Sequence, residues 1–107
     1  ISWVPDHSTE LHDHGGSLGA LTLLSGSLDE FRWDGEALRH RRIDAGDQAA
    51  FPLGWVHDVG WAPTPAAPTL SVHAYSPPLT AMSYYEVTDR NTLRRKRTEL
   101  TDTPEGQ

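Results

Sequence analysis

Short apolar or alternating segments follow one another along the chain and are separated by turn residues at close intervals, a pattern typical of β-strands. The predicted strands lie within residues 1–4, 10–14, 20–26, 27–33, 36–43, 48–52, 53–61, 69–77 and 81–87. Residues 93–97 predict either a last edge strand or a short helix. The spacing indicates an all-β sandwich or barrel of antiparallel strands, and not a helical or alternating α/β protein.

The length and the turn signals indicate one domain. The 107 residues suffice for one modest core but not for two. The turn pair Asp34 and Gly35 predicts a hairpin, and the Pro/Ala-rich residues 62–68 predict a surface loop. We expect a single domain over residues 1–97 and a polar tail over 98–107.

The charge and the hydropathy of the chain exclude several classes of partner. A formal net charge of −6 argues against a nucleic-acid partner, which needs clustered excess cations. The one basic run, "RNTLRRKR" at residues 90–97, is expected to be a solvated face. No apolar run approaches the roughly 18 residues that a membrane span requires, and no leader precedes Ile1, so we expect no membrane partner and a cytoplasmic location.

Histidine is the residue type that points to chemistry. The chain contains no cysteine, which excludes a disulfide scaffold, a thiolate zinc site and a cysteine nucleophile. His12 and His14 are one residue apart, and in a strand such side chains share a face, so two imidazoles could grip one metal ion. The alternative is two ordinary exposed or hydrogen-bonded histidines. A third histidine, His57, follows Pro52 and Gly54 at the approach to a strand.

Two spaced motifs carry a family resemblance. The first consists of His12, His14, Gly19 and Gly26, and the second of Gly46, Pro52, Gly54 and His57. At this spacing the chain resembles the cupin superfamily, which implies a double-stranded β-helix, or jelly-roll barrel, with His12, His14 and His57 as metal ligands. The chain departs from the family pattern at Asp6 and Trp61, which replace a Gly and an Asn, and at Gly19, which replaces a ligand Glu.

The replacement of the ligand Glu changes the expected metal chemistry. Three neutral imidazoles leave the charge of a dication uncompensated, which favours anionic ligands such as a thiolate or a carboxylate at the open positions. We expect one Fe(2+) per chain, although affinity alone would not exclude nickel, zinc or copper.

Within the cupins, the chain resembles the cysteine dioxygenase family of thiol dioxygenases. The stretches "LHDHGGSLGA", "VHDV" and "SVHAYSPPLTAM" carry the resemblance, together with Trp3. It implies that Ser71, His73 and Tyr75, which alternate on one strand, form a catalytic relay. Animal members of the family carry, at the position of Gly19, the Cys that crosslinks to the Tyr. This chain has glycine there, as the bacterial type does, so no such crosslink can form.

The resemblance implies an iron-dependent dioxygenase that oxidises a small thiol, such as L-cysteine or 3-mercaptopropionate, to its sulfinic acid with dioxygen. Met82 and Trp55 are candidate substrate contacts, although both side chains also suit packing. The alternatives are a non-catalytic cupin module that binds a metal or a small ligand, and a structural barrel without metal. A monomer or a homodimer is expected.

The family also has an arginine that clamps the substrate carboxylate, about two dozen positions ahead of the His-x-His pair. That position would precede Ile1, so the domain is expected to lack an N-terminal segment. Arg32 or Arg39 could replace this arginine only if their strands faced the cavity, and their polar neighbours argue against that.

Overall fold

The computed structural model describes residues 1–6, 8–64 and 68–102. These residues form nine strands and no helix, which confirms the all-β prediction. The strands are β1 (Ser2–Trp3), β2 (Leu18–Ser25), β3 (Ser27–Trp33), β4 (Leu38–Asp44), β5 (Gln48–Phe51), β6 (His57–Trp61), β7 (Thr69–Ser76), β8 (Ala81–Val87) and β9 (Leu93–Leu100). Over the described ranges, the chain contains no helix long and apolar enough to cross a membrane.

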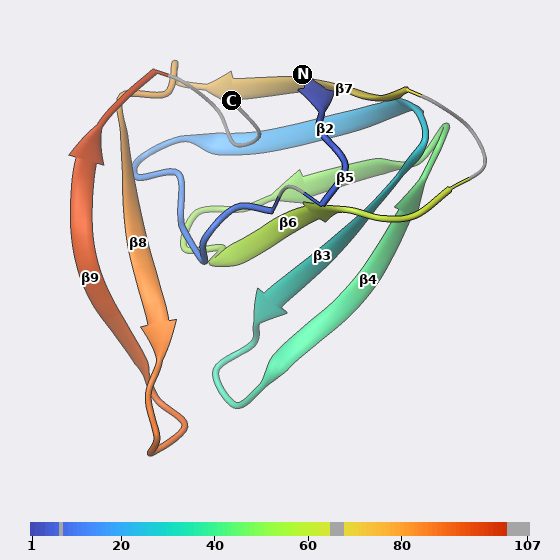
Figure 1. Ribbon diagram of the computed structural model, residues 1–107. Coiled ribbons are helices and arrows are strands. Elements are labelled where there is room, and N and C mark those ends of the chain that lie inside the picture. The colour runs from blue at the N-terminus through green and yellow to red at the C-terminus, as the bar shows by residue number, and fades with distance from the viewer. Residues whose placement is uncertain (7, 65–67, 103–107) are drawn as a thin grey trace.

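The strands form antiparallel sheets, shown in Figure 1. One sheet has the order β1-β7-β2-β5, a second has the order β4-β3-β6, and β8 pairs with β9. His12 forms isolated bridges with His57 of β6 and with Tyr84 of β8, so the chain around His12 lies between these two strands. The second sheet is thereby continued, through His12, into the β8–β9 hairpin.

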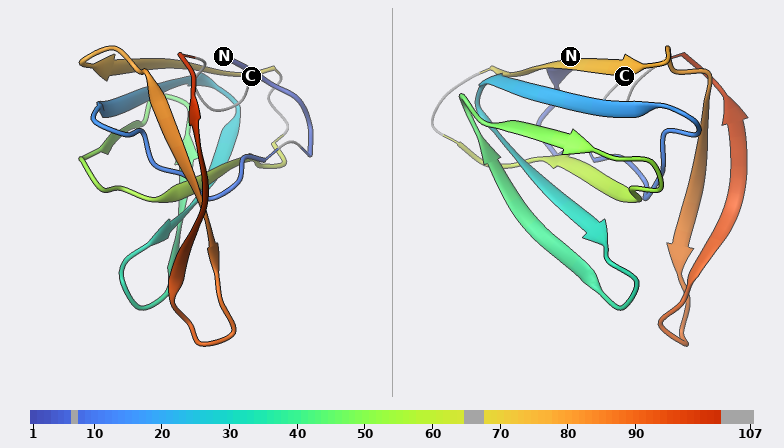
Figure 2. Two further views of the ribbon diagram at one scale, coloured as in Figure 1. Left: turned by 90° about the vertical axis from the view of Figure 1, so that its left-hand side faces the viewer. Right: turned by 180° about the vertical axis from the view of Figure 1, so that it is seen from behind.

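The hydrophobic core lies between the first two sheets. The alternation of buried and exposed positions along β2 and β5 points every second side chain inward. The buried cluster consists of Trp3, Leu21, Leu23, Leu28, Ile43, Ala49, Phe51 and Val59. Beyond this core, the β3–β4 and β8–β9 hairpins both project to the same side of the molecule, as Figure 2 shows from two further directions.

The register places two of the histidines in the middle of one transverse row. Directly paired residues on antiparallel neighbours point to the same face of a sheet. Following the pairs from β4 to β9 gives the row Arg39, Arg32, His57, His12, Tyr84 and Arg97. His12 and His57 are therefore neighbours on one face, with two arginines beyond His57 and with Tyr84 and Arg97 beyond His12.

Two sequence predictions need correction, for residues 10–14 and 98–100, and the alternative left open for residues 93–97 is decided in favour of the strand. Residues 10–14 do not form a strand, because His12 is held there only by its two isolated bridges. Residues 93–97 form a strand and not a helix, and this strand, β9, continues through residues 98–100, which were expected to begin the tail. Residues 65–67 of the expected loop and 103–107 of the expected tail lie outside the described residues.

Candidate metal centre

Three buried histidines converge in the space between the sheets. The ligand atoms that His12, His14 and His57 offer all lie within 4.8 Å of one another. The ring centroids are 5.1 Å apart for His12 and His14, and 4.9 Å apart for His12 and His57. The exposed fraction of each residue is 4% or less. The rings are therefore close enough for one metal ion to be shared, and imidazole nitrogen is a donor that suits iron, nickel, copper and zinc.

Backbone contacts position the His-x-His segment although it is not a strand. The backbone N–H of His12 donates to the carbonyl of His57 at 2.9 Å, and the reverse bond is 3.0 Å long. Asp13 points to the other side, where its carboxylate accepts bonds from the backbone N–H of Ser83 at 3.1 Å and the hydroxyl of Tyr85 at 2.7 Å. The segment is thus fixed to β6 on one side and to β8 on the other.

Hydrogen bonds fix the tautomers of two of the rings. Nδ1 of His12 lies 2.6 Å from the carbonyl oxygen of Glu10, and Nδ1 of His57 lies 2.8 Å from Oε2 of Glu30. Both oxygens accept, so Nδ1 carries the proton in each ring. Nε2 is then the nitrogen that could coordinate a metal. Such outer partners orient the rings of ligand histidines.

Glu30 was not predicted from the sequence. Its carboxylate is almost fully buried on β3, beside His57. Burial alone would raise the pKa of Glu30, but the hydrogen bonds from His57 and Trp55 and the charge of Arg41 outweigh that effect and hold the pKa below its ordinary value. The three neutral histidines expected from the sequence therefore lie beside an ionised carboxylate, which is hydrogen-bonded to His57. The signal was present in the alternation of "SLDE", which places Glu30 on the same face as the core residue Leu28.

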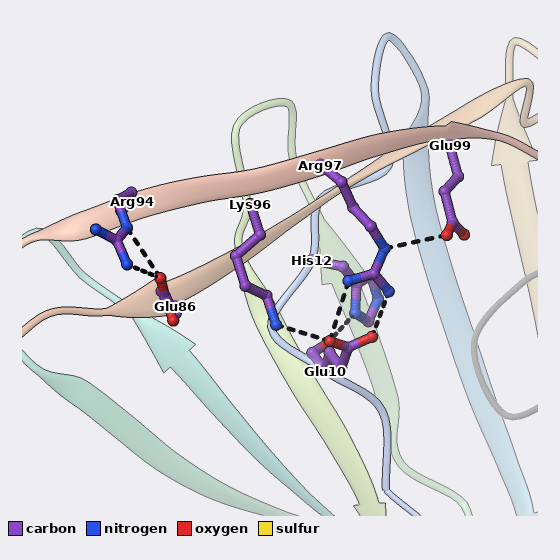
Figure 3. A network of polar contacts seen from close by, with 7 residues as sticks. All are labelled: Glu10, His12, Glu86, Arg94, Lys96, Arg97 and Glu99. Carbon is purple, nitrogen blue, oxygen red and sulfur yellow. Dashed lines mark hydrogen bonds and ion pairs between the residues drawn. The ribbon is translucent and has the colours of Figure 1, made fainter.

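Glu10 is held in place by the C-terminal strand. Figure 3 shows Lys96 and Arg97 of β9 reaching the carboxylate of Glu10 beside His12. The shortest distances are 2.8 Å from Nζ of Lys96 and 2.5 Å from Nη2 of Arg97. The hydrogen bonds from Arg97 and Lys96 lower the pKa of Glu10 to about 2. The residue whose carbonyl orients His12 is therefore tied to β9 through its side chain.

The three residues of the predicted relay lie in hydrogen-bonding order on β7. Oγ of Ser71 is 2.7 Å from Nε2 of His73, and Nδ1 of His73 is 3.4 Å from the hydroxyl of Tyr75. The indole N–H of Trp3 donates to Oγ of Ser71 at 2.9 Å. The ring centroid of Tyr75 lies 5.1 Å from that of His14, so this row ends beside the histidine cluster.

The absence of a side chain at Gly19 leaves room for Tyr75. Gly19 of β2 is paired with Tyr75 of β7 on one side and with Phe51 of β5 on the other. A Cβ atom at position 19 would lie 2.9 Å from Cε1 of Tyr75. The aromatic ring therefore packs directly over the glycine backbone.

The two predicted substrate contacts, Met82 and Trp55, come from different parts of the fold and differ in burial. Met82 is buried on β8, two residues before Tyr84, whose ring centroid is 6.2 Å from that of His12. Trp55 is half-buried, packs against the core, and donates its indole N–H to Oε2 of Glu30 at 3.3 Å. Their role as substrate contacts stays a prediction.

The expectation that both arginines face away from the interior is wrong for Arg32 alone, because the side chain of Arg39 is 61% exposed and forms an ion pair with Asp34. Arg32 shares a strand face with Glu30 and is paired directly with both Arg39 and His57. Its guanidinium stacks over the ring of Trp55, at 4.3 Å from the centroid. The polar residues next to Arg32 in the sequence suggested a solvated strand. The β3–β4 hairpin extends past the core, so polar residues also occur on its inner face.

Comparison with known proteins gives the family. The model of the family described as cysteine dioxygenase type I matches residues 1–88. A search of curated proteins finds no match for the chain. The matched residues include the three histidines and the Ser71, His73 and Tyr75 row, and the family has the cupin β fold. The chain belongs to the cysteine dioxygenase type I family.

Proposed function

We propose that the protein is an iron-dependent thiol dioxygenase, which converts a small thiol and O2 into the corresponding sulfinic acid. The reaction adds both oxygen atoms to sulfur, so that R–SH and O2 give R–SO2H with no other reactant. L-cysteine is the first candidate substrate and 3-mercaptopropionate the second. The observation that carries the proposal is the convergence of His12, His14 and His57 beside the end of the β7 row, in a chain of this family.

The histidines would hold one iron ion per chain through Nε2 of His12 and His57 and one ring nitrogen of His14. Bound iron would supply the meeting point for sulfur and O2 and would accept and return electrons during the reaction. The apolar ring of Phe51 covers the cluster, with its centroid 4.4 Å from that of His57 and 5.7 Å from that of His14. This packing would exclude water from that side of the cluster.

The β7 row would orient a proton at Tyr75. Because the indole of Trp3 only donates, Oγ of Ser71 accepts there and can give its own proton to Nε2 of His73. Nδ1 of His73 then carries a proton toward the oxygen of Tyr75. Tyr75 would in turn direct its hydroxyl proton toward substrate or oxygen in a hydrogen bond.

Oxygen consumption tests the proposal. The whole chain is loaded with Fe(2+) without air and mixed with L-cysteine, 3-mercaptopropionate or an alcohol analogue of each. We expect O2 uptake with at least one thiol, in equal amount to the sulfinic acid formed, and none with the alcohols. His57→Ala should abolish both metal content and uptake, whereas His40→Ala should abolish neither, because His40 is exposed and pairs with Asp29.

Absence of thiol-dependent uptake by the iron-loaded protein would contradict the proposal. If the protein still bound one metal ion per chain, the result would favour a non-catalytic metal-binding module. If it bound no metal at all, the histidine cluster would be a structural feature of the barrel.

A further inference from the structure

Three side chains bind the buried carboxylate of Glu30. Its Oε2 atom accepts the Nδ1 proton of His57 at 2.8 Å and the indole N–H of Trp55 at 3.3 Å. Its Oε1 atom lies 2.7 Å from Nη2 of Arg41. The side chains of Glu30 and His57 are exposed by only 2% and 0%, so this pair is screened little by water.

Burying a carboxylate costs desolvation free energy, so the presence of one at this position calls for a reason other than stability. Replacing a buried ionic group by a well-packed apolar one is often neutral or stabilising, so stability alone is a weak reason for a glutamate at this position. The carboxylate contacts the one metal-ligand candidate that comes from β6. Gly19, by contrast, stands where the cupin pattern has a carboxylate ligand.

We propose that Glu30 is a positioning residue of the metal centre: its carboxylate holds the ring of His57 and supplies, through that ring, the negative charge that three imidazole ligands lack. A carboxylate that accepts the Nδ1 proton makes Nε2 a stronger donor to a metal ion. The proposal rests on the metal binding that is part of the proposed function, but it does not depend on which reaction follows.

Arg41 gives the proposal a distinctive consequence. Its side chain is 44% exposed and comes from β4, the edge strand of the sheet, where Arg41 is paired with Glu30. The guanidinium competes with His57 for the charge of the carboxylate. Removal of this cation should therefore strengthen metal binding, whereas removal of the carboxylate charge should weaken it. A merely structural ion pair would give the same sign for both changes.

The experiment compares three single variants of the whole chain. Glu30→Gln removes the charge but keeps an oxygen that can accept from His57. Arg41→Gln removes the competing cation. Asp29→Asn is the matched control, because it removes one negative charge from the adjacent position of β3, on the outer face, where Asp29 pairs with His40. The affinity for Zn(2+) and for Co(2+) is measured by competition with a chelator, and thermal unfolding of the metal-free proteins is measured in parallel.

We expect Glu30→Gln to weaken the affinity for both metals by about 10- to 100-fold, the usual effect of losing an outer partner of a ligand histidine. Arg41→Gln should tighten it by about two- to five-fold at low salt, since the exposed guanidinium is partly screened. Asp29→Asn should stay within about two-fold of the unchanged protein, because its charge is on the solvated face.

Equal affinity of the folded Glu30→Gln variant and the unchanged protein would overturn the proposal. If Glu30→Gln does not fold, Arg41→Gln decides alone, and weaker or unchanged binding by that variant refutes the role of the charge. These outcomes are separable from the proposed function: a protein that binds metal with the expected shifts but consumes no O2 retains the role of Glu30 and loses the dioxygenase.

Discussion

The close approach of Gly19 to two aromatic rings makes a quantitative prediction for Gly19→Ala. The added Cβ would lie 2.9 Å from Cε1 of Tyr75 and 3.1 Å from Cδ2 of Phe51. Carbon atoms in ordinary contact are about 3.5–4.0 Å apart, so the rings must move by roughly 0.5–1 Å. The φ angle of Gly19 is not among the positive values found in the described residues, so alanine is strained by contact and not by its backbone.

The magnitude follows from two opposing effects. Overpacking of a core position costs about 1–3 kcal/mol. Replacing Gly by Ala also restricts the unfolded chain, which stabilises the folded state by about 0.4–1 kcal/mol. The net loss in the free energy of unfolding should therefore be on the order of 1–2 kcal/mol. The movement of the Tyr75 ring should also alter its hydrogen bond to His73, which is 3.4 Å long.

Urea denaturation of the whole chain measures the loss, and Gly16→Ala is the control. No atom would lie within 4 Å of a Cβ at position 16, so this variant should be as stable as the unchanged protein or slightly more stable. A second comparison repeats Gly19→Ala in a Tyr75→Ala background, where the cost should fall to the part caused by Phe51. If Gly19→Ala matches Gly16→Ala in stability, or costs the same in both backgrounds, the steric argument is wrong.

Three further predictions concern residues that support the site. Trp3→Phe removes the indole donor to Ser71 and should cost about 1–3 kcal/mol in urea denaturation while metal content stays unchanged; loss of the metal would contradict this. Glu10→Gln should lower Tm by no more than about 5 °C at low salt and not at all in 1 M NaCl, because its ion pairs are exposed, and a loss that persists in high salt would show another role. Tyr85→Phe removes the hydroxyl that binds Asp13 and should cost about 1–2 kcal/mol by the same denaturation assay; an unchanged free energy of unfolding would mean that water replaces this bond.

Local patterns in the sequence were sufficient to predict most strands. The alternation in "SLDEFRW" and the turn at Asp34 and Gly35 predict β3 and its hairpin, since both depend on neighbours in the chain. β9 was ambiguous because seven of its eight residues are exposed, so no alternation marks it. Backbone pairing with β8 decides its conformation, and that pairing is a contact between strands that sequence periodicity does not encode.

The candidate site was predictable only in part, because it too depends on contacts between segments that are far apart in the sequence. Adjacent spacing suggested that His12 and His14 act together, and they do converge, although by backbone bonds to β6 and not within a strand. Recognising His57 as their partner required the family resemblance, because the register between β6 and the His12 segment is long-range. Glu30 was missed because glutamate is rarely fully buried, and only its pairing with Arg41 and His57 explains its position.

The position of β9 sets a limit on how the domain can be shortened. The family match ends at residue 88, immediately after β8, whereas β9 spans Leu93–Leu100. A chain cut at residue 88 would leave β8 as an open edge strand, with unpaired N–H and C=O groups able to recruit another molecule. Because the opposite edge of β8 meets His12, aggregation through this strand would begin beside the histidine cluster. β9 covers this edge of β8, and its row of exposed cationic side chains disfavours pairing with a further strand.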